Sequence, residues 1–221
     1  MKIFLLLVFS AFITSTYGQN EPDATMQDVN AEPYLGQISQ FFNPAKAIQI
    51  EFKYEITTPE PPSKLTDHGS ILIKGDKYKL KIEEGEIYFN GKNLWVYNEN
   101  AKEVYKSIPD TENMDNMILA PFRMIKDYKA YYKYRLKEDL QISGTLYAQV
   151  ELYPIDLHTS FAKMRILINK KTGKFFSFSM QQKSGILYTI YTEEIITDVK
   201  INDNAFSWDK TLFPDVLEVE M

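Results

Sequence analysis

Residues 48–56 read Ile-Gln-Ile-Glu-Phe-Lys-Tyr-Glu-Ile, a strict alternation of apolar and polar side chains. Successive side chains of a β-strand point to opposite faces, so this pattern predicts a strand with one apolar face and one face in water. Pro59, Pro61 and Pro62 follow within six residues and are expected to end the strand, because proline cannot continue a ladder of backbone hydrogen bonds. The stretch therefore predicts a sheet with a single apolar face.

The same alternation recurs along most of the chain. Strands are expected at residues 69–74, 78–82, 86–89, 94–97, 102–108, 132–136, 146–152, 162–168, 176–180 and 186–199. The pair Asn90-Gly91 lies between two of these runs and supplies the positive φ angles of a tight hairpin, so neighbouring strands are expected to be antiparallel. About ten antiparallel strands with few helices exclude a parallel α/β fold and predict a large, strongly curved sheet or barrel.

Two segments replace the alternation with helical spacing. Pro33 is expected to open a short helix that ends before Pro44, with apolar residues three or four apart at Leu35, Ile38, Phe41 and Phe42. Residues 111–128 predict a second, helical insertion, whose apolar positions are Met114, Met117, Ile118, Phe122 and Ile125. So few helices cannot cover the apolar face completely. We therefore expect them to form a partial lid and to leave an apolar cavity that binds apolar ligands. The alternative is a sandwich whose aromatic side chains simply fill the core.

The first residues predict export. Lys2 precedes an apolar run at residues 3–13, shorter than the roughly 20 residues of a membrane-spanning helix. We expect residues 1–18 to be a signal peptide, cleaved after Gly18, and residues 19–221 to form a single domain. The chain has no cysteine, which excludes disulfides, a thiol nucleophile and an acylated cysteine anchor. Its formal net charge of −5 argues against a nucleic-acid partner.

The sequence offers no recognisable catalytic centre. Its two histidines, His68 and His158, do not stand at a metal-binding spacing, and no nucleophile elbow or phosphate-binding glycine loop occurs. Adjacent acids such as Glu83 and Glu84 would point to opposite faces of a strand and could not act together on one substrate. The basic, tyrosine-rich residues 126–135 resemble a stacking platform for bases, but packing of half-buried tyrosines explains them better. We therefore expect a protein without enzymatic activity, cofactor or metal.

Several motifs resemble the LolA family of lipoprotein carriers. The first two are Gly69-Ser-Ile-Leu-Ile-Lys-Gly-Asp-Lys-Tyr-Lys-Leu80 and Ile87-Tyr-Phe-Asn-Gly-Lys-Asn-Leu-Trp-Val-Tyr97, similar to that family's glycine-led strand and its D/N-G-k-x-l-W-x-Y strand. The closing segments Val199-Lys-Ile-Asn-Asp-Asn-Ala-Phe-Ser-Trp208 and Phe213-Pro-Asp-Val-Leu-Glu-Val219 resemble the end of the family pattern. Each motif is loose, but their order and spacing agree over residues 30–219. One departure is Gly75-Asp76, where the family often has an Arg-Pro pair that helps to hold the lid shut.

The resemblance implies a mainly β (α+β) fold: an open, incomplete antiparallel β-barrel of about eleven strands, with short helices forming a lid over an apolar cavity. It also implies a monomeric periplasmic chaperone that takes acylated lipoproteins from an inner-membrane ABC exporter to an outer-membrane acceptor. We expect the residues that contact the acyl chains to be Ile50, Phe52, Tyr54, Ile56, Leu80, Ile82, Trp95, Met117, Phe122, Phe176 and Phe178. A related open-barrel protein for another lipid or a glycolipid, and a ligand-free structural β-sandwich, are the alternatives.

Overall fold

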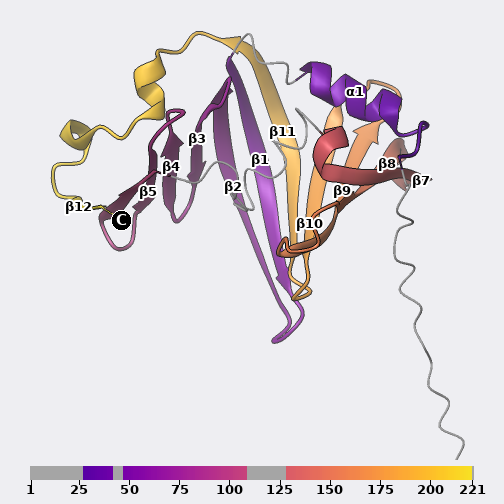
Figure 1. Ribbon diagram of the computed structural model, residues 1–221, viewed down its shortest axis with the longest axis horizontal. Coiled ribbons are helices and arrows are strands. Elements are labelled where there is room, and N and C mark those ends of the chain that lie inside the picture. The colour runs from indigo at the N-terminus through magenta and orange to yellow at the C-terminus, as the bar shows by residue number, and fades with distance from the viewer. Residues whose placement is uncertain (1–26, 42–46, 109–127, 221) are drawn as a thin grey trace, which may run out of the picture.

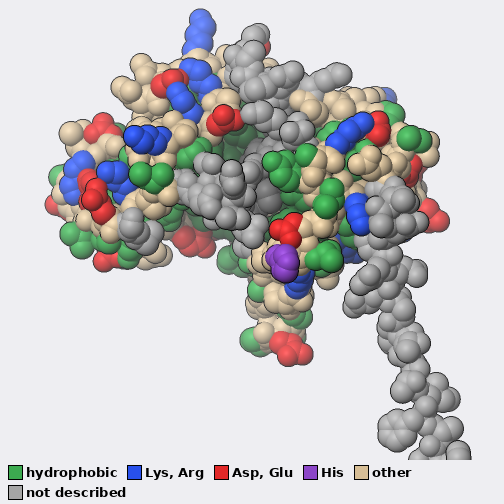
Figure 2. Space-filling view, viewed as in Figure 1, with side chains coloured by type: hydrophobic (Ala, Val, Ile, Leu, Met, Phe, Trp, Pro, Cys, Tyr) green, Lys and Arg blue, Asp and Glu red, His purple; other side chains and the backbone are tan. Residues whose placement is uncertain are grey.

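The alternating stretch forms strand β1 (Ala47–Thr58), which lies inside a single sheet of twelve strands (Figure 1). The computed structural model describes residues 27–41, 47–108 and 128–220. Strand β1 pairs along its length with β2 (Ser63–Lys74) on one side and with β11 (Leu187–Val199) on the other. Residues nearly 150 positions apart, such as Ile48 and Thr197, thus become direct neighbours. The β1–β2 hairpin projects beyond the rest of the sheet (Figures 1 and 2).

The sheet has two arms that meet at the β1–β11 pair. One arm contains β2, β3 (Lys77–Ile82), β4 (Gly85–Phe89), β5 (Leu94–Asn98), β6 (Glu103–Ser107) and β12 (Leu217–Glu220). The other contains β10 (Phe175–Gln182), β9 (Phe161–Asn169), β8 (Thr145–Pro154) and β7 (Tyr132–Ile142). The strand order is linear, with β12 and β7 as its two edges, so the predicted open, incomplete barrel is confirmed. The described strands form one sheet, which contradicts the sandwich alternative.

The structure corrects several local expectations. Strand β12 was not predicted, and it pairs parallel with β6, whereas the sequence predicted antiparallel pairs alone. Strand β2 begins six residues earlier than expected, directly after the prolines. The Asn90-Gly91 hairpin is confirmed, with Gly91 at a φ of 91°, but its loop spans residues 90–93 because Phe89 pairs with Leu94.

The N-terminal segment also differs from expectation. Residues 19–32 are polar and carry no strong pattern, which predicts a flexible lead. In the structure, Gln27 bridges to Tyr134, and the backbone N–H of Leu136 donates to the Asp28 carboxylate at 3.0 Å. Residues 27 and 28 therefore cover part of the free edge of β7. Helix α1 (Glu32–Phe41) follows, as predicted. Phe42 and the expected helical insertion up to Asp127 lie outside the described residues, as does the expected signal peptide.

We call the face onto which Phe52, Leu80 and Phe178 project the inner face, and the opposite one the outer face. The inner face carries two hydrophobic clusters. On the β7–β10 arm, Leu35 and Ile38 of α1 pack against Tyr134, Val150, Ile166 and other buried side chains. On the β1–β5 side, a second cluster contains Ile50, Phe52, Ile71, Leu80 and Leu94, without a described helix among its members. The outer face carries a third hydrophobic cluster near β12, where two short 3-10 helices (Asp203–Phe206 and Lys210–Leu212) cross it.

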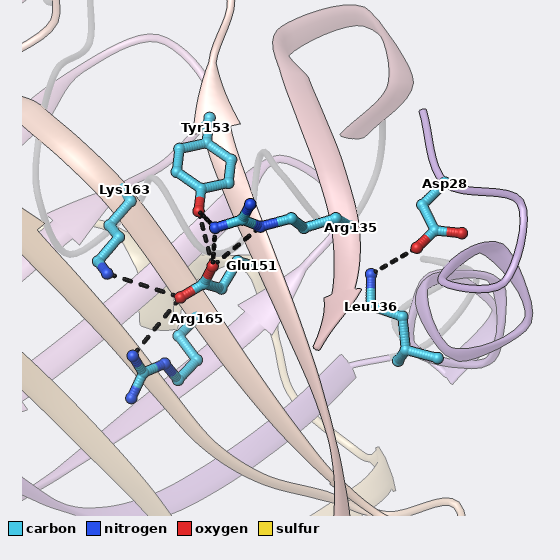
Figure 3. Close-up of polar contacts among 7 residues, drawn as sticks. All are labelled: Asp28, Arg135, Leu136, Glu151, Tyr153, Lys163 and Arg165. Atoms are coloured by element: carbon cyan, nitrogen blue, oxygen red, sulfur yellow. Dashed lines mark hydrogen bonds and ion pairs between the residues drawn. The ribbon is translucent and has the colours of Figure 1, made fainter. Parts of the chain in front are cut away.

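The most buried charge on the outer face is Glu151 of β8, which is 4% exposed (Figure 3). Its Oε2 accepts hydrogen bonds from Arg135 Nη2 at 2.9 Å and from the Tyr153 hydroxyl at 2.6 Å. Its Oε1 lies 3.6 Å from Lys163 Nζ and 3.5 Å from Arg165 Nη2. Burial opposes ionisation of Glu151, but the bonds from Tyr153 and Arg135 and the nearby positive charges outweigh it and lower the pKa to about 2. The carboxylate thus joins strands β7, β8 and β9.

Replacing Glu151 by glutamine should lower the free energy of unfolding at pH 7 by about 1.5–3 kcal/mol, because hydrogen bonds to a charged group are lost. A pKa lowered by folding means that the ionised side chain stabilises the protein above the unfolded pKa near 4.5 and ceases to do so as the pH falls towards 2. Urea unfolding of wild type and Glu151→Gln should therefore differ at pH 7 and converge only as the pH falls to about 2. The control is Glu138→Gln, an exposed carboxylate on β7, which should stay within about 0.5 kcal/mol of wild type. Equal losses in the two variants would show that the cluster does not stabilise the fold.

Candidate ligand cavity

A cavity of about 350 Å³ opens on the inner face, over the strands at the centre of the sheet. Four strands contribute its walls: β3, β1, β11 and β10, with Glu84 of the β3–β4 turn at the rim. The lining residues are Phe52, Tyr54, Glu55, Ile56, Leu80, Ile82, Glu84, Phe178, Met180, Tyr188, Thr189 and Ile190. The side chains of Glu55 and Thr189 bond on the outer face, to Lys53 and Ser179 respectively, so these two residues contribute backbone. The surface that a ligand would meet is therefore almost wholly apolar.

Strand register explains why these side chains converge. Tyr54 lies opposite Ile190, which lies opposite Phe178, so the three form one row across β1, β11 and β10. Directly opposed residues of antiparallel strands project to the same face. Phe178 and Met180 also belong to the cluster beneath α1, so the cavity wall is continuous with the packed core. The site is built on paired strands, which hold its shape.

Gly69 on β2 makes room for Phe52. The two residues are direct partners across β1 and β2, and the Phe52 ring lies over the glycine. A Cβ atom at position 69 would stand 2.7 Å from Cζ of Phe52 and 2.8 Å from the carbonyl oxygen of Lys81. Real carbon atoms do not approach so closely, so any side chain here would displace the ring or the backbone. The glycine that leads the family-like motif thus has a packing role at the cavity wall.

One polar pair among the lining residues joins the buried Tyr54 to the exposed Glu84. The Tyr54 hydroxyl donates to Glu84 Oε2 at 3.2 Å, and burial together with the Glu84 charge raises the pKa of Tyr54, so the phenol stays protonated. Nearby, a hydrogen bond with Asp67 raises the pKa of Glu83, while the pKa of Asp67 is lowered. Among the residues that the structure describes, no three acidic or histidine side chains could hold a metal ion. The same residues include no helix long and apolar enough to cross a membrane.

Six of the predicted contact residues line this cavity: Phe52, Tyr54, Ile56, Leu80, Ile82 and Phe178. Ile50 lies in the adjoining hydrophobic cluster on the same face. Met117 and Phe122, the predicted lid residues, lie outside the described part of the chain. Whether any of these side chains contacts a lipid stays a prediction.

The prediction that Trp95 lines the cavity is wrong, because this side chain lies on the outer face. Leu94 and Val96 turn to the inner face, and Trp95 packs on the outer face with Tyr88, Tyr97 and Val104. Both faces of β5 are apolar because Val216, Trp208 and Phe213 of the C-terminal segment cover the outer one. Periodicity within β5 contains no sign of that distant cover.

Phe176 also lies on the outer face, in contrast to Phe178. The register of β10 against β9 shifts between Phe175 and Ser177. A β-bulge there interrupts the alternation of side chains between the two faces at Phe175 and Phe176. Phe175 packs towards the core under α1, and the ring of Phe176 lies 4.5 Å from that of Tyr147 and 6.0 Å from that of Tyr191, centroid to centroid. The sequence predicts an uninterrupted alternation of faces along residues 176–180, and the bulge makes that prediction wrong for Phe176.

Apart from Glu84 and the backbone of Glu55 and Thr189, three lining residues were missed: Met180, Tyr188 and Ile190. Met180 continues the alternation of Phe178 and could have been included on that signal. Tyr188 and Ile190 alternate too, but β11 loses its period at the irregularity between Thr192 and Glu194, which obscures the pattern.

No protein-family model matches this chain, and no curated protein matches it. Its fold is shared with an uncharacterised conserved protein from Thermus thermophilus, at a TM-score of 0.55 and 11% identity over 87% of this chain and 99% of that one.

The structure is also similar to a LolA superfamily protein from Nitrosomonas europaea, at a TM-score of 0.42 and 13% identity over 80% of this chain and 97% of that one. A third similar structure is a putative outer membrane lipoprotein-sorting protein domain from Vibrio parahaemolyticus, at a TM-score of 0.45 and 12% identity over 83% of this chain and 99% of that one.

Gly69→Ala should destabilise the protein by about 1–3 kcal/mol, the usual range for overpacking, because the new methyl group collides with Phe52 and with the Lys81 carbonyl. Gly36→Ala in α1 is the matched control: a Cβ there meets nothing within 4 Å, and alanine is the better helix former by about 1 kcal/mol. Urea unfolding should therefore move in opposite directions for the two variants. A neutral or stabilising Gly69→Ala would mean that the Phe52 ring does not need this glycine.

Proposed function

We propose that this chain is a lipid-binding carrier without enzymatic activity, which holds part of an acyl chain in the inner-face cavity. The observation that carries the proposal is the lining: rings and aliphatic side chains from four strands, with a polar pair between Tyr54 and the exposed Glu84. A volume of about 350 Å³ falls at the lower end of the range for small-molecule sites, roughly 300–1,000 Å³. Such a site suits an apolar chain whose polar end stays near the solvent.

The energetics favour a carrier over a storage protein. Each buried methylene contributes roughly 0.8 kcal/mol, so a short part of one acyl chain already supplies several kcal/mol. Complete burial of several chains would make release extremely slow. A cavity that takes up part of the cargo allows transfer between partners of rising affinity, without a nucleotide, a metal or a chemical step.

We further propose that the cargo is an acylated lipoprotein, accepted from an inner-membrane ABC exporter and delivered by a monomer through the periplasm to an outer-membrane acceptor. The support is the ordered series of LolA-like motifs over residues 30–219, together with the apolar run at residues 3–13 that suggests export. Binding of another lipid or a glycolipid by the same cavity is the second candidate. Native mass spectrometry of the protein purified from the periplasm distinguishes the two, since it identifies the bound molecule by its mass.

Ile56→Asp should weaken binding of a fluorescent acyl probe by about tenfold or more, because a charge would face the apolar chain. Thr57→Asp is the matched control: it adds the same charge one position along β1, on the outer face, and should bind the probe as wild type does. Circular dichroism and the urea midpoint establish that both variants fold. Equal probe affinity in the two variants would contradict the assignment of the cavity as the lipid site.

A further inference from the structure

The outer face of β7, β8 and β9 concentrates positive charge on an otherwise acidic chain. Lys133, Arg135 and Lys137 alternate along β7, and Lys163 and Arg165 stand on β9, on either side of Glu151 (Figure 3). Three of these five cations pair with the single buried carboxylate of Glu151, while the whole chain carries a formal charge of −5. We call these five residues the cationic patch. Its charge is far from neutralised within the sheet.

The cationic patch has unused capacity to bind anions. Arg135, Lys163 and Arg165 are paired with Glu151, whereas Lys133 and Lys137 have no acidic partner among the described residues. An external group with negative oxygens would satisfy the ammonium groups of Lys133 and Lys137.

An exposed loop beside the cationic patch carries two apolar side chains on either side of Asp156, whose carboxylate accepts the backbone N–H of His158 at 2.8 Å. Residues 155–160 join β8 to β9, and within them Leu157 is 77% exposed and Ile155 is 48% exposed. The Ile155 N–H donates to the carbonyl of Tyr131, whose own ring is 49% exposed, so the three apolar side chains occupy one end of the sheet. The Lys183 ammonium donates to the Leu157 carbonyl and adds a further cation there.

We propose that this end of the sheet docks on an anionic lipid bilayer, with Ile155 and Leu157 entering the boundary of the hydrocarbon and the cationic patch facing the phosphates. Apolar side chains at the tip with cations behind them match the depth profile of a membrane surface. An acidic protein would neutralise the cations, but its binding would not explain why Leu157 is exposed. The rest of the molecule is acidic and is repelled by such a membrane, which fixes the orientation of docking.

The docked end also lies near the cavity. Lys183 N–H donates to the carbonyl of Ser160, which ties the loop to the β10–β11 turn, and the cavity-lining Met180 and Tyr188 flank that turn. Docking would therefore bring the cavity close to the lipid surface. The inference itself rests on the charges and the exposed loop and stands apart from the identity of the cargo.

The test is sedimentation with lipid vesicles of neutral phosphatidylcholine, alone or mixed with anionic phosphatidylglycerol. The chain from residue 19 onward contains every described residue and excludes the apolar run at 3–13, which could itself bind the vesicles. The chain should bind the anionic vesicles in preference to the neutral ones, and added salt should weaken the binding. Lys133→Gln with Lys137→Gln should lower the partition coefficient on the order of tenfold or more, and Leu157→Ser should lower it severalfold.

Matched controls distinguish the proposed site from a general effect of positive charge or of exposed apolar side chains. Lys92→Gln with Lys171→Gln removes two exposed lysines from other turns, and Leu212→Ser removes a side chain that is 72% exposed elsewhere. Both controls should bind as wild type does. Three results would each overturn the proposal: absence of vesicle binding, equal loss in the controls and the patch variants, or binding of polyglutamate that needs the lysines and ignores Leu157. The last result would identify an acidic protein as the partner.

Discussion

Strand β1 is hydrogen-bonded to β2 on one side and to β11 on the other, and this double pairing governs the rest of the architecture. It fixes the faces of three strands at once, because a shift of one residue would move Phe52 and its neighbours into water. It also joins the first strands of the chain to the last long one, so the two arms of the sheet share one apolar face. The fold then depends on how that face is kept from water.

The two arms of the sheet differ in how their apolar faces are covered. Helix α1 lays Leu35 and Ile38 onto the β7–β10 arm and completes a packed core there. Over the β1–β5 side, the described residues provide no helix. The cavity forms where this side meets the β7–β10 arm, and Tyr54 and Phe178 lie there in one row. A ligand at this position would bury apolar surface that the described protein leaves uncovered. Among the described residues, the cavity thus forms where the open sheet has no helix over it.

Much of this could be predicted from the sequence, because the alternation of period two is a local property. It located the strands, the inner face of β1 and β3, and six of the residues that line the cavity. What it could not provide depends on contacts between distant residues. The C-terminal segment that covers Trp95, the parallel addition of β12 to β6 and the pairing of Gln27 with Tyr134 all join residues about a hundred positions apart. The bulge at Phe176 is a different failure, since it interrupts the period within one strand.

The outer face shows how one buried charge can both stabilise a fold and create a binding surface. Glu151 is too deeply buried to remain ionised without partners, so the sheet surrounds it with Arg135, Tyr153, Lys163 and Arg165. One carboxylate cannot neutralise three cations, and the excess necessarily faces outward. Beside this excess of positive charge, the β8–β9 loop exposes the apolar side chains of Ile155 and Leu157. A surface built in this way attracts anions and apolar groups together, a combination that a bilayer offers and that bulk solvent does not.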